Sequence, residues 1–453
     1  MKKRWSAYVY FTRLSLSNVK AFGAAQDLDL RDPKTGRPAQ WTLILGDNGV
    51  GKTTLLECVA LMRPVLSVQP KFHADAPEPD WLQPALAFEE DSNLIAMARI
   101  GAGGGVRLEA DLLCGRRLNG PGGRGRLINV HAAIEISNGT LKNFSTSEEA
   151  NAAFTQPLIV GYSAARHMAF NRGDPIKTSE DATAQLFEPD IQLEDAEEVL
   201  ERLDYAFARG DRNSGALLKH LKVALAKILP DVSKPEDIRI YPPATPASTR
   251  RKTGVRFVTP YGEVPFRSLS LGYQTVAAWT ADLTWKLFNR YPKSSDPLNE
   301  PAVVLIDEID LHLHPHWQRT IRQHVSQSFP QVQFIATAHS PLVAQSYLDT
   351  NIVVLKRKGR SIEIENDPTV VSSWGVDEVV TSELFGLTSS YAPPIDDLIR
   401  ERARLLRLSK RTPRDKVRLD ELQRFVATLP TEDEPGDQEV LDRLRTAAAL
   451  LGK

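Results

Sequence analysis

The sequence predicts an α/β protein with a mixed sheet, and three patterns lead to that prediction. An apolar run at 41–45 passes through a glycine-rich turn into a helical pattern at 52–61. After residue 302, apolar strands alternate with helical segments, which favours parallel strands joined by crossover helices. Residues 10–19 and 26–30 alternate between apolar and polar side chains, as expected of half-buried strands that precede this core.

The remaining elements follow from local periodicity. Strand-like runs, beginning with LIAMARI and separated by glycine-rich turns, predict an antiparallel β appendage over about 85–140. Apolar residues at spacings of three and four predict a helical subdomain over about 190–290. Further helical patterns fill 374–450. We therefore expect one domain over 1–345. A strand and a helical extension over 346–453 would contact a partner or a second subunit.

Composition narrows the classes of protein. The chain has 453 residues, a formal net charge of -1 and two cysteines, Cys58 and Cys114, without a CxxC pattern. A disulfide scaffold and a zinc knuckle are therefore excluded, and a reducing cytoplasmic location is expected. The basic start lacks the apolar segment of a signal peptide, and no run approaches the roughly 18 apolar residues of a membrane span.

The glycine-rich turn reads GDNGVGKTT and fits the pattern G-x4-G-K-[ST] between a strand and a helix. Its glycines allow successive backbone N–H groups to turn toward a phosphate, and the positive end of the helix adds to their field. We expect Lys52 to neutralise β- and γ-phosphate oxygens and Thr53 to bind Mg²⁺. The predicted ATP-binding residues are Gly46, Asp47, Asn48, Gly49, Val50, Gly51, Lys52, Thr53 and Thr54.

Two carboxylates follow the buried strand AVVLI, at Asp307 and Glu308. In a parallel sheet, the carboxyl end of this strand would lie beside the phosphate-binding turn. We expect Asp307 to act as a ligand in the outer shell of the Mg²⁺ held by Thr53. Glu308, one residue further, is the candidate general base for the water that attacks the γ-phosphate.

Two further stretches resemble a known family. LSLGYQ at 269–274 resembles the LSxGxQ signature of ABC-type ATPases, and His339 in TAHSP resembles their switch histidine. The order of the four motifs is also that of the family. The resemblance implies that the phosphate loop of one subunit and the signature of another enclose ATP in a head-to-tail homodimer. It assigns catalysis to Lys52, Glu308 and His339 and adds the ATP contacts Ser270, Gly272 and Gln274.

Four features are similar to the RecF/SMC-like branch of this family: RLSLSNVKAFG at the entry, the GDNGVGKTT turn, LHLHP after the acids, and the TAHSP ending. The AAA-family ATPases of bacterial defence, which include the PtuA proteins of Septu systems and the OLD-type ATPases, are resembled by four longer stretches: VGYSAAR at 160–166, PYGEVPFRSLSLGYQT, VLIDEIDLHLHPHWQR and QFIATAHSPLV. This resemblance implies a nucleotide-driven switch that forms a dimer or a higher oligomer. The switch would act on nucleic acid, DNA being one candidate, or on a partner nuclease such as an HNH protein in anti-phage defence, and no membrane partner is expected.

Two other functions stay open. A transporter cassette would use the same site to drive a separate permease, although the 37 positions from Ser270 to Asp307 and the long helical tail disfavour it. An OLD-like, ATP-regulated nuclease would need a carboxylate cluster for metals. The acids available for such a cluster show no obvious arrangement: Asp367, Asp377, Glu378, Asp396 and Asp397.

Other residues allow two interpretations each. His312, His314 and His316 alternate, so they are candidate metal ligands or hydrogen-bonding groups across a dimer. Tyr162 and Arg166 end an apolar strand and either line the nucleotide or have a structural role.

Two basic stretches either contact nucleic-acid phosphates or form a solvated face. The first is Arg250, Arg251 and Lys252, and the second is 400–418, with nine Lys or Arg against two acids.

Overall fold

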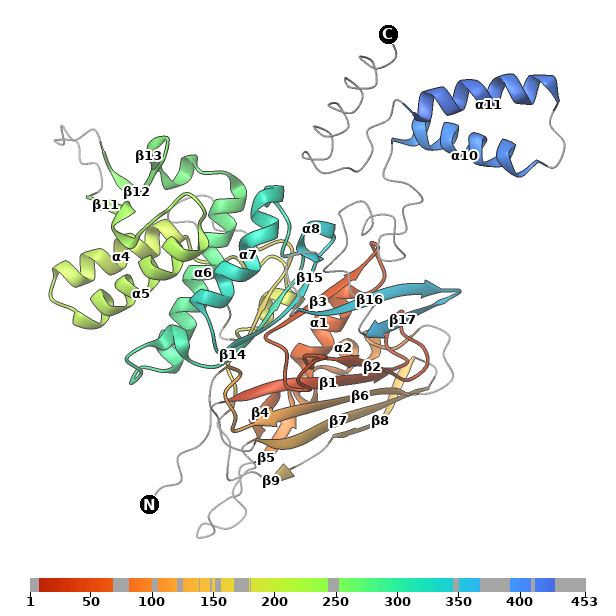
Figure 1. Ribbon diagram of the computed structural model, residues 1–453. Coiled ribbons are helices and arrows are strands. Elements are labelled where there is room, and N and C mark those ends of the chain that lie inside the picture. Colours follow the sequence, from red (N-terminus) through yellow and green to blue (C-terminus); the bar gives the residue numbers. More distant parts are fainter. Residues whose placement is uncertain are drawn as a thin grey trace. The chain divides into compact units, whose positions relative to one another are not determined.

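The computed structural model describes most of the chain, which forms two compact units, Met1–Phe385 and Gly386–Lys453 (Figure 1). The described residues are 8–67, 81–99, 105–119, 125–137, 139–146, 149–150, 156–166, 179, 181–242, 252–344, 350–366, 392–408 and 412–427. Within these ranges, no helix combines the length and the apolar character needed to cross a membrane.

A six-stranded sheet forms the centre of the first unit, with strand order β10-β14-β15-β3-β16-β17. All neighbours are parallel except β17, which pairs antiparallel with β16. The bounds are β3 (Trp41–Gly46), β10 (Ile159–Tyr162), β14 (Ala302–Ile306), β15 (Val332–Thr337), β16 (Asn351–Lys358) and β17 (Ser361–Asn366). Both β14 and β15 are buried along their whole length, as in a sheet covered on two faces.

Alternate residues of these strands belong to two different hydrophobic cores. Val304 faces the core built with the helices that precede and follow β14. Val303 and Ile44 face the other core, which contains α1 (Lys52–Leu61) and the antiparallel strands. The phosphate-binding turn joins β3 to α1, so it lies at the carboxyl edge of a sheet held from both sides.

The antiparallel sheet contains five strands in the order β2-β1-β6-β7-β8. Its bounds are β1 (Val9–Ser17), β2 (Gln26–Asp29), β6 (Val106–Cys114), β7 (Arg126–Ser137) and β8 (Thr140–Thr146). The segment LIAMARI departs from the prediction, because its first three residues, 94–96, end α2 (Asp91–Ala96), which follows η1 (Ala85–Phe88). A short apolar run suits a strand or a helix equally. A further small sheet contains β4 (Pro64–Ser67), β5 (Trp81–Pro84) and β9 (Glu149–Ala150).

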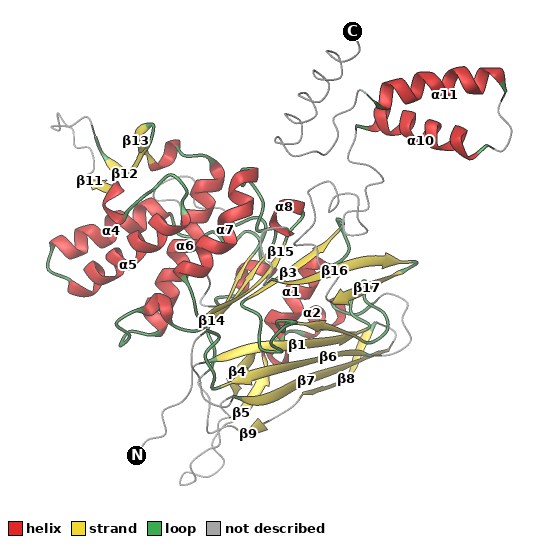
Figure 2. Cartoon of the chain, in the orientation of Figure 1, coloured by secondary structure: helices red, strands yellow, loops and turns green. Residues whose placement is uncertain are grey.

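Between β10 and β14, most of the described elements are helices (Figure 2). They are α3 (Ala184–Phe187), α4 (Ala196–Ala208), α5 (Arg212–Ile228) and α6 (Leu271–Arg290), with η2 (Pro235–Asp237), η3 (Phe266–Ser268) and η4 (Pro297–Asn299). Asp195 and Asp211 cap α4 and α5 through their carboxylates. The periodicity did not indicate the small sheet inserted here, β11 (Ile238–Tyr241), β12 (Gly254–Thr259) and β13 (Gly262–Pro265).

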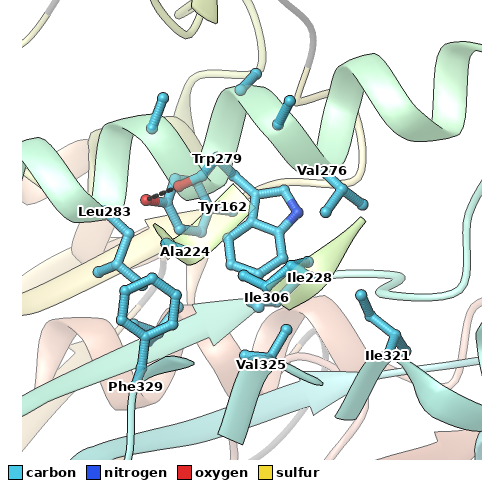
Figure 3. Close-up of a cluster of buried hydrophobic side chains, with 14 of the residues drawn as sticks. Tyr162, Ala224, Ile228, Val276, Trp279, Leu283, Ile306, Ile321, Val325 and Phe329 are labelled. Atoms are coloured by element: carbon cyan, nitrogen blue, oxygen red, sulfur yellow. Dashed lines mark hydrogen bonds between the residues drawn. The ribbon is translucent and has the colours of Figure 1, made fainter. Parts of the chain in front are cut away.

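Trp279 of α6 lies at the centre of the helical core, fully buried (Figure 3). Side chains of α5, α6, α7 (Pro315–Ser328) and β14, and Phe329 directly after α7, surround it: Ala224, Ile228, Val276, Leu283, Ile306, Ile321, Val325 and Phe329. Tyr162 at the end of β10 packs against the same indole and donates from its hydroxyl toward the Trp279 carbonyl at 3.3 Å. This core therefore joins the signature helix α6 to the strand that carries the two acids.

The C-terminal part differs from the expected division at residue 346. β16 pairs with β3 from Asn351 to Leu355, so it belongs to the central sheet, and the division falls after Phe385. The second unit contains α10 (Pro393–Arg407) and α11 (Pro413–Val426), packed through Leu405, Leu419 and Leu422. The helical patterns predicted within 374–391 and after residue 427 lie outside the described residues, as do Asp367, Asp377 and Glu378.

Candidate ATP-binding site

The turn between β3 and α1 holds three glycines with positive φ: Gly46 at 149°, Gly49 at 76° and Gly51 at 92°. A Cβ atom at Gly46 would lie 2.9 Å from the Leu355 carbonyl oxygen, so β16 requires glycine here. Within the described residues, the N–H groups of 48–54 meet no acceptor, and the first bond runs from the Leu55 N–H to the Gly51 carbonyl. Such unpaired N–H groups at a helix start form an anion-binding cradle.

Lys52 lies inside this turn and is buried. Its Nζ donates to the carbonyl oxygens of Gly46 at 2.8 Å and Asp47 at 2.9 Å. Burial lowers the pKa of the amine below its ordinary value, while the charges of Asp307 and Glu308 oppose that shift. The ammonium group is therefore held at the cradle by neutral oxygens, and its charge is available to a phosphate.

Asp307 connects the turn to β15 through hydroxyl groups. The Thr53 hydroxyl donates to one carboxylate oxygen at 2.7 Å, and the Thr337 hydroxyl donates to the other at 2.6 Å. The same Thr337 oxygen accepts the Glu308 N–H at 2.7 Å. Asp307 and Thr337 are both buried. Sequence reasoning did not single out Thr337, although it opens the TAHSP stretch at the end of β15.

Glu308 and His339 face each other at the open side of the acids. His339 Nε2 lies 3.8 Å from Glu308 Oε1, and each side chain is 33% exposed. Glu308 has a positive φ of 50°, which side-chain-bearing residues rarely adopt. The His339 N–H donates to both Asp310 oxygens, at 3.1 and 3.3 Å, so the loop after β14 also positions the histidine backbone.

The residues at this edge fit Mg²⁺ bound together with phosphates. Thr53 and Asp307 offer a hydroxyl and a carboxylate in contact, and Mg²⁺ is commonly held by one or two such hard oxygen ligands plus phosphate oxygens. The histidine triplet does not form a comparable site, because the His314 ring accepts the His316 N–H at the start of α7. Among the described residues, no group of three or more His, Cys, Asp or Glu side chains is arranged to hold a metal.

The signature stretch forms the first turn of α6. Ser270 is the N-cap residue and is exposed, but its side chain makes no capping hydrogen bond. A Cβ atom on Gly272 would lie 2.3 Å from the His312 carbonyl oxygen, so the helix start rests on the loop after the acids. The Gln274 side chain donates to the Leu269 carbonyl at 2.8 Å and thereby stabilises the segment that precedes α6. The structure thus keeps these residues apart from the hydrogen-bonded group around Thr53, Asp307 and Thr337.

Tyr162 and Arg166 have different roles, which the sequence left open. Tyr162 is part of the helical core, and its hydroxyl also donates to Asp282 at 2.7 Å. Its role is structural. Arg166 instead reaches the main chain of both acids, donating to the carbonyl oxygens of Asp307 and Glu308.

The two basic stretches are only partly described, since Arg250, Arg251 and 409–411 lie outside the described residues. Lys252 forms an ion pair with Glu263. On α10 and α11, Arg418 pairs with Glu401 and Glu421, as expected of a solvated helical hairpin. A role in nucleic-acid binding stays a prediction.

Two family models match the chain. The AAA domain of putative AbiEii toxins of type IV toxin–antitoxin systems matches residues 182–344, and a second AAA-domain model matches residues 13–62. The first match contains the signature, the two acids and His339. The second contains the phosphate-binding turn.

Curated relatives match over segments of 93 to 177 residues. A retron Vc95 probable ATPase from Vibrio cholerae is 43% identical over 93 residues, which is 20% of this chain and 18% of that protein. A retron Ec83 probable ATPase from Escherichia coli is 34% identical over 177 residues, 38% of this chain and 30% of that protein. The Septu protein PtuA of Bacillus mycoides is 33% identical over 156 residues, which is 34% of this chain and 21% of that protein. The chain thus spans less than a third of the length of each of these three relatives.

A search of solved structures finds similar chains as well. One is an SMC head domain from Thermotoga maritima, with 11% identity, a TM-score of 0.40 and coverage of 80% of this chain and all of that one. The phosphate-binding turn, the acids behind it and the family and relative matches together agree on one identification. The chain contains an AAA/ABC-type ATPase domain that resembles PtuA.

Proposed function

We propose that this protein binds ATP with Mg²⁺ and hydrolyses it. One observation carries the proposal: hydrogen bonds link Thr53, Asp307, Thr337 and the Glu308 backbone beneath a turn whose N–H groups are unpaired. Each part is suited to one task in phosphoryl transfer, which depends on positioning and electrostatic stabilisation.

The residues divide the chemistry as follows. The N–H groups of 48–54 and Lys52 hold the β- and γ-phosphates, while Thr53 and Asp307 hold Mg²⁺, which neutralises phosphate charge when bound. Glu308 accepts a proton from the attacking water. His339, 3.8 Å from that carboxylate, orients the water and the γ-phosphate on the open side.

We further propose that the second half of the site comes from another subunit. Ser270 and Leu271 at the start of α6 are exposed, while Gly272 is buried, and this helix start would form another anion-binding group. A head-to-tail homodimer would bring this group onto the γ-phosphate bound by the partner. ATP would close the dimer and hydrolysis would reopen it, because only the γ-phosphate contacts both halves.

The biological role we propose is a cytoplasmic switch in bacterial anti-phage defence. The support is similarity to retron probable ATPases and to Septu PtuA proteins. The output would be a partner nuclease such as an HNH protein, or DNA bound by the dimer.

Glu308→Gln tests the enzymatic part of the proposal. The variant should bind ATP normally but hydrolyse it about 1,000-fold more slowly, as expected on loss of a general base. It should also accumulate as an ATP-bound dimer in light scattering. Lys52→Ala is the matched control, because it should stay a monomer at any ATP concentration. Native turnover in Glu308→Gln would show that the base is another residue, and a monomer saturated with ATP would refute the dimer.

The proposed partner can be identified with the same variant. Tagged Glu308→Gln protein held with ATP would be recovered from its host, and bound proteins and nucleic acid would be identified by mass spectrometry and staining. A co-purified nuclease or DNA supports the defence switch. A membrane permease would show that the protein drives transport.

A further inference from the structure

Arg166 lies directly behind the two acids of the proposed ATPase site. It follows β10, the strand next to β14, and only 4% of its surface is exposed. One guanidinium nitrogen, Nη1, donates to the Asp307 carbonyl and to the Ser163 carbonyl at 3.1 Å. The other, Nη2, donates to the Glu308 carbonyl at 2.9 Å. A single planar group therefore holds the two consecutive peptide oxygens that follow β14.

These carbonyls belong to an unusual stretch of backbone. In the described part of the chain, four residues other than glycine have positive φ: Asn18, Lys20, Glu308 and His312. Two of the four lie in the six residues after β14. A conformation that is unfavourable in isolation persists only where surrounding groups hold it, and such residues cluster at functional sites. The Glu308 carbonyl accepts from Arg166 and from the Leu311 N–H, and the Glu308 N–H donates to the Thr337 hydroxyl.

We propose that Arg166 is a positioning residue for hydrolysis: its guanidinium fixes the backbone of Asp307 and Glu308 and thereby aims the Glu308 carboxylate. This inference rests on the proposed ATPase function and deepens it. Arg166 bonds to carbonyl oxygens and leaves the carboxylate oxygens to Thr53, Thr337 and His339. The acids therefore keep their capacity to bind a metal or to accept a proton, while a buried positive charge stands behind them.

The chemistry of the contact requires arginine. A guanidinium presents several N–H groups in a rigid plane, whereas a lysine ammonium is a single flexible donor centre. Burial lowers the pKa of Arg166 to about 10, against the opposing charges of Asp307, Asp310 and Glu308, yet the group stays protonated at neutral pH. A lysine at this position would thus keep the charge but could not hydrogen-bond both carbonyl oxygens at the same time.

The test compares Arg166→Met and Arg166→Lys with Arg99→Met. Arg99 is the matched control, because its guanidinium also spans two carbonyls, those of Ala21 and Arg360, away from the acids. We expect Arg166→Met to lower kcat about 100-fold, as for a misplaced catalytic group, with KM and ATP affinity within about twofold of native. Arg166→Lys should lower kcat about tenfold, and Arg99→Met should leave it unchanged.

The results separate this inference from the proposed function. If the native protein does not hydrolyse ATP, the proposed function fails first. If native protein hydrolyses ATP and a folded Arg166 variant keeps native kcat, the positioning role is refuted and the ATPase function stands. If Arg166→Met does not fold, the kcat of Arg166→Lys tests the positioning role instead, because this variant keeps the buried positive charge. A rise in KM with unchanged kcat would also refute the proposal, because it would place Arg166 in nucleotide binding.

Discussion

The phosphate loop and the signature stretch both lie at helix starts, but they differ in hydrogen bonding and in exposure. Around α1, the Thr53 hydroxyl is bonded to Asp307, and Lys52 is buried against loop carbonyls. At α6, Ser270 is exposed and makes no capping bond, while Gly272 is pressed against the His312 carbonyl. The phosphate loop with Lys52 and Thr53 is thus assembled within the subunit, and we call it the assembled half. The signature stretch at the start of α6, with Ser270 exposed on the surface, is called the displayed half.

This difference suggests a division of labour. The assembled half would bind ATP alone and set the ground state of the nucleotide. The displayed half would contribute only when another subunit approaches, so its residues would affect dimerisation and turnover while leaving the first binding step unchanged. The contact between Gly272 and His312 also ties the displayed half to the loop that carries Glu308.

The largest expected effect contrasts Lys52→Ala with Ser270→Ala. Loss of Lys52 removes charge-assisted bonds to phosphate, each worth about 1.5–3 kcal/mol, so ATP affinity of the dilute monomer should fall at least about 100-fold. Ser270→Ala should leave that affinity unchanged. Equilibrium titration with a fluorescent ATP analogue measures both. Equal losses in the two variants would erase the proposed distinction.

The next largest expected effect is a loss of folding stability in Thr337→Val. The substitution preserves shape but leaves the Glu308 N–H and one Asp307 oxygen without the buried hydroxyl that serves both. An unsatisfied buried group costs about 1–3 kcal/mol, so unfolding by urea should occur at lower concentration. The exposed Ser270→Ala is the control, expected within about 0.5 kcal/mol of native. An unchanged midpoint for Thr337→Val would contradict the described hydrogen bonds.

Gly272→Ala tests the packing of the displayed half. Its new Cβ would meet the His312 backbone at 2.3 Å, and overpacking of this kind costs about 1–3 kcal/mol. Thermal unfolding should show the loss, and ATP-driven dimerisation should weaken because the α6 start must move. Binding of the first ATP should be unaffected. A native-like stability would mean that the helix start is free to shift and is not tied to the His312 loop.

The smallest predicted effect concerns pH. Burial lowers the pKa of Lys52 below its ordinary value of 10.5, so the amine loses its charge at a lower pH than an exposed lysine. ATP affinity should be constant while Lys52 is protonated and should fall as pH rises through that lowered pKa, by about tenfold per unit. Titrations between pH 7 and 10.5 measure the profile, and Ser270→Ala should follow the same curve. An affinity that stays constant over the whole range would contradict the assigned role.

Local sequence predicted the assembled half of the site well. Lys52 and Thr53 follow an apolar strand and open a helix, and Asp307 ends a strand whose neighbours are parallel, so spacing alone places them together. The same logic predicted the order of strands and helices after β14. These features depend on patterns that are contiguous in the chain.

Features that depend on distant pairings could not be read in the same way. Arg166 acts on carbonyls 141 and 142 positions away, and a side chain that binds main-chain oxygens requires no particular partner residue. α2 was predicted as a strand because its apolar run is too short to show a period. The residues of β16 were assigned to the C-terminal part, since only its pairing with β3 places that strand in the central sheet.

A mixing experiment tests the central claim, that each ATP site uses the assembled half of one subunit and the displayed half of another. Lys52→Ala loses the first half, and Ser270→Asp places a negative charge against the γ-phosphate in the second. Each variant alone should be inactive. A mixed dimer would have one intact site of two, formed by Lys52 of the Ser270→Asp subunit and Ser270 of the Lys52→Ala subunit. ATP turnover in an equimolar mixture should therefore recover, to at most about half of the native level. Turnover that stays at the level of the separate variants would show that the two halves do not combine between subunits.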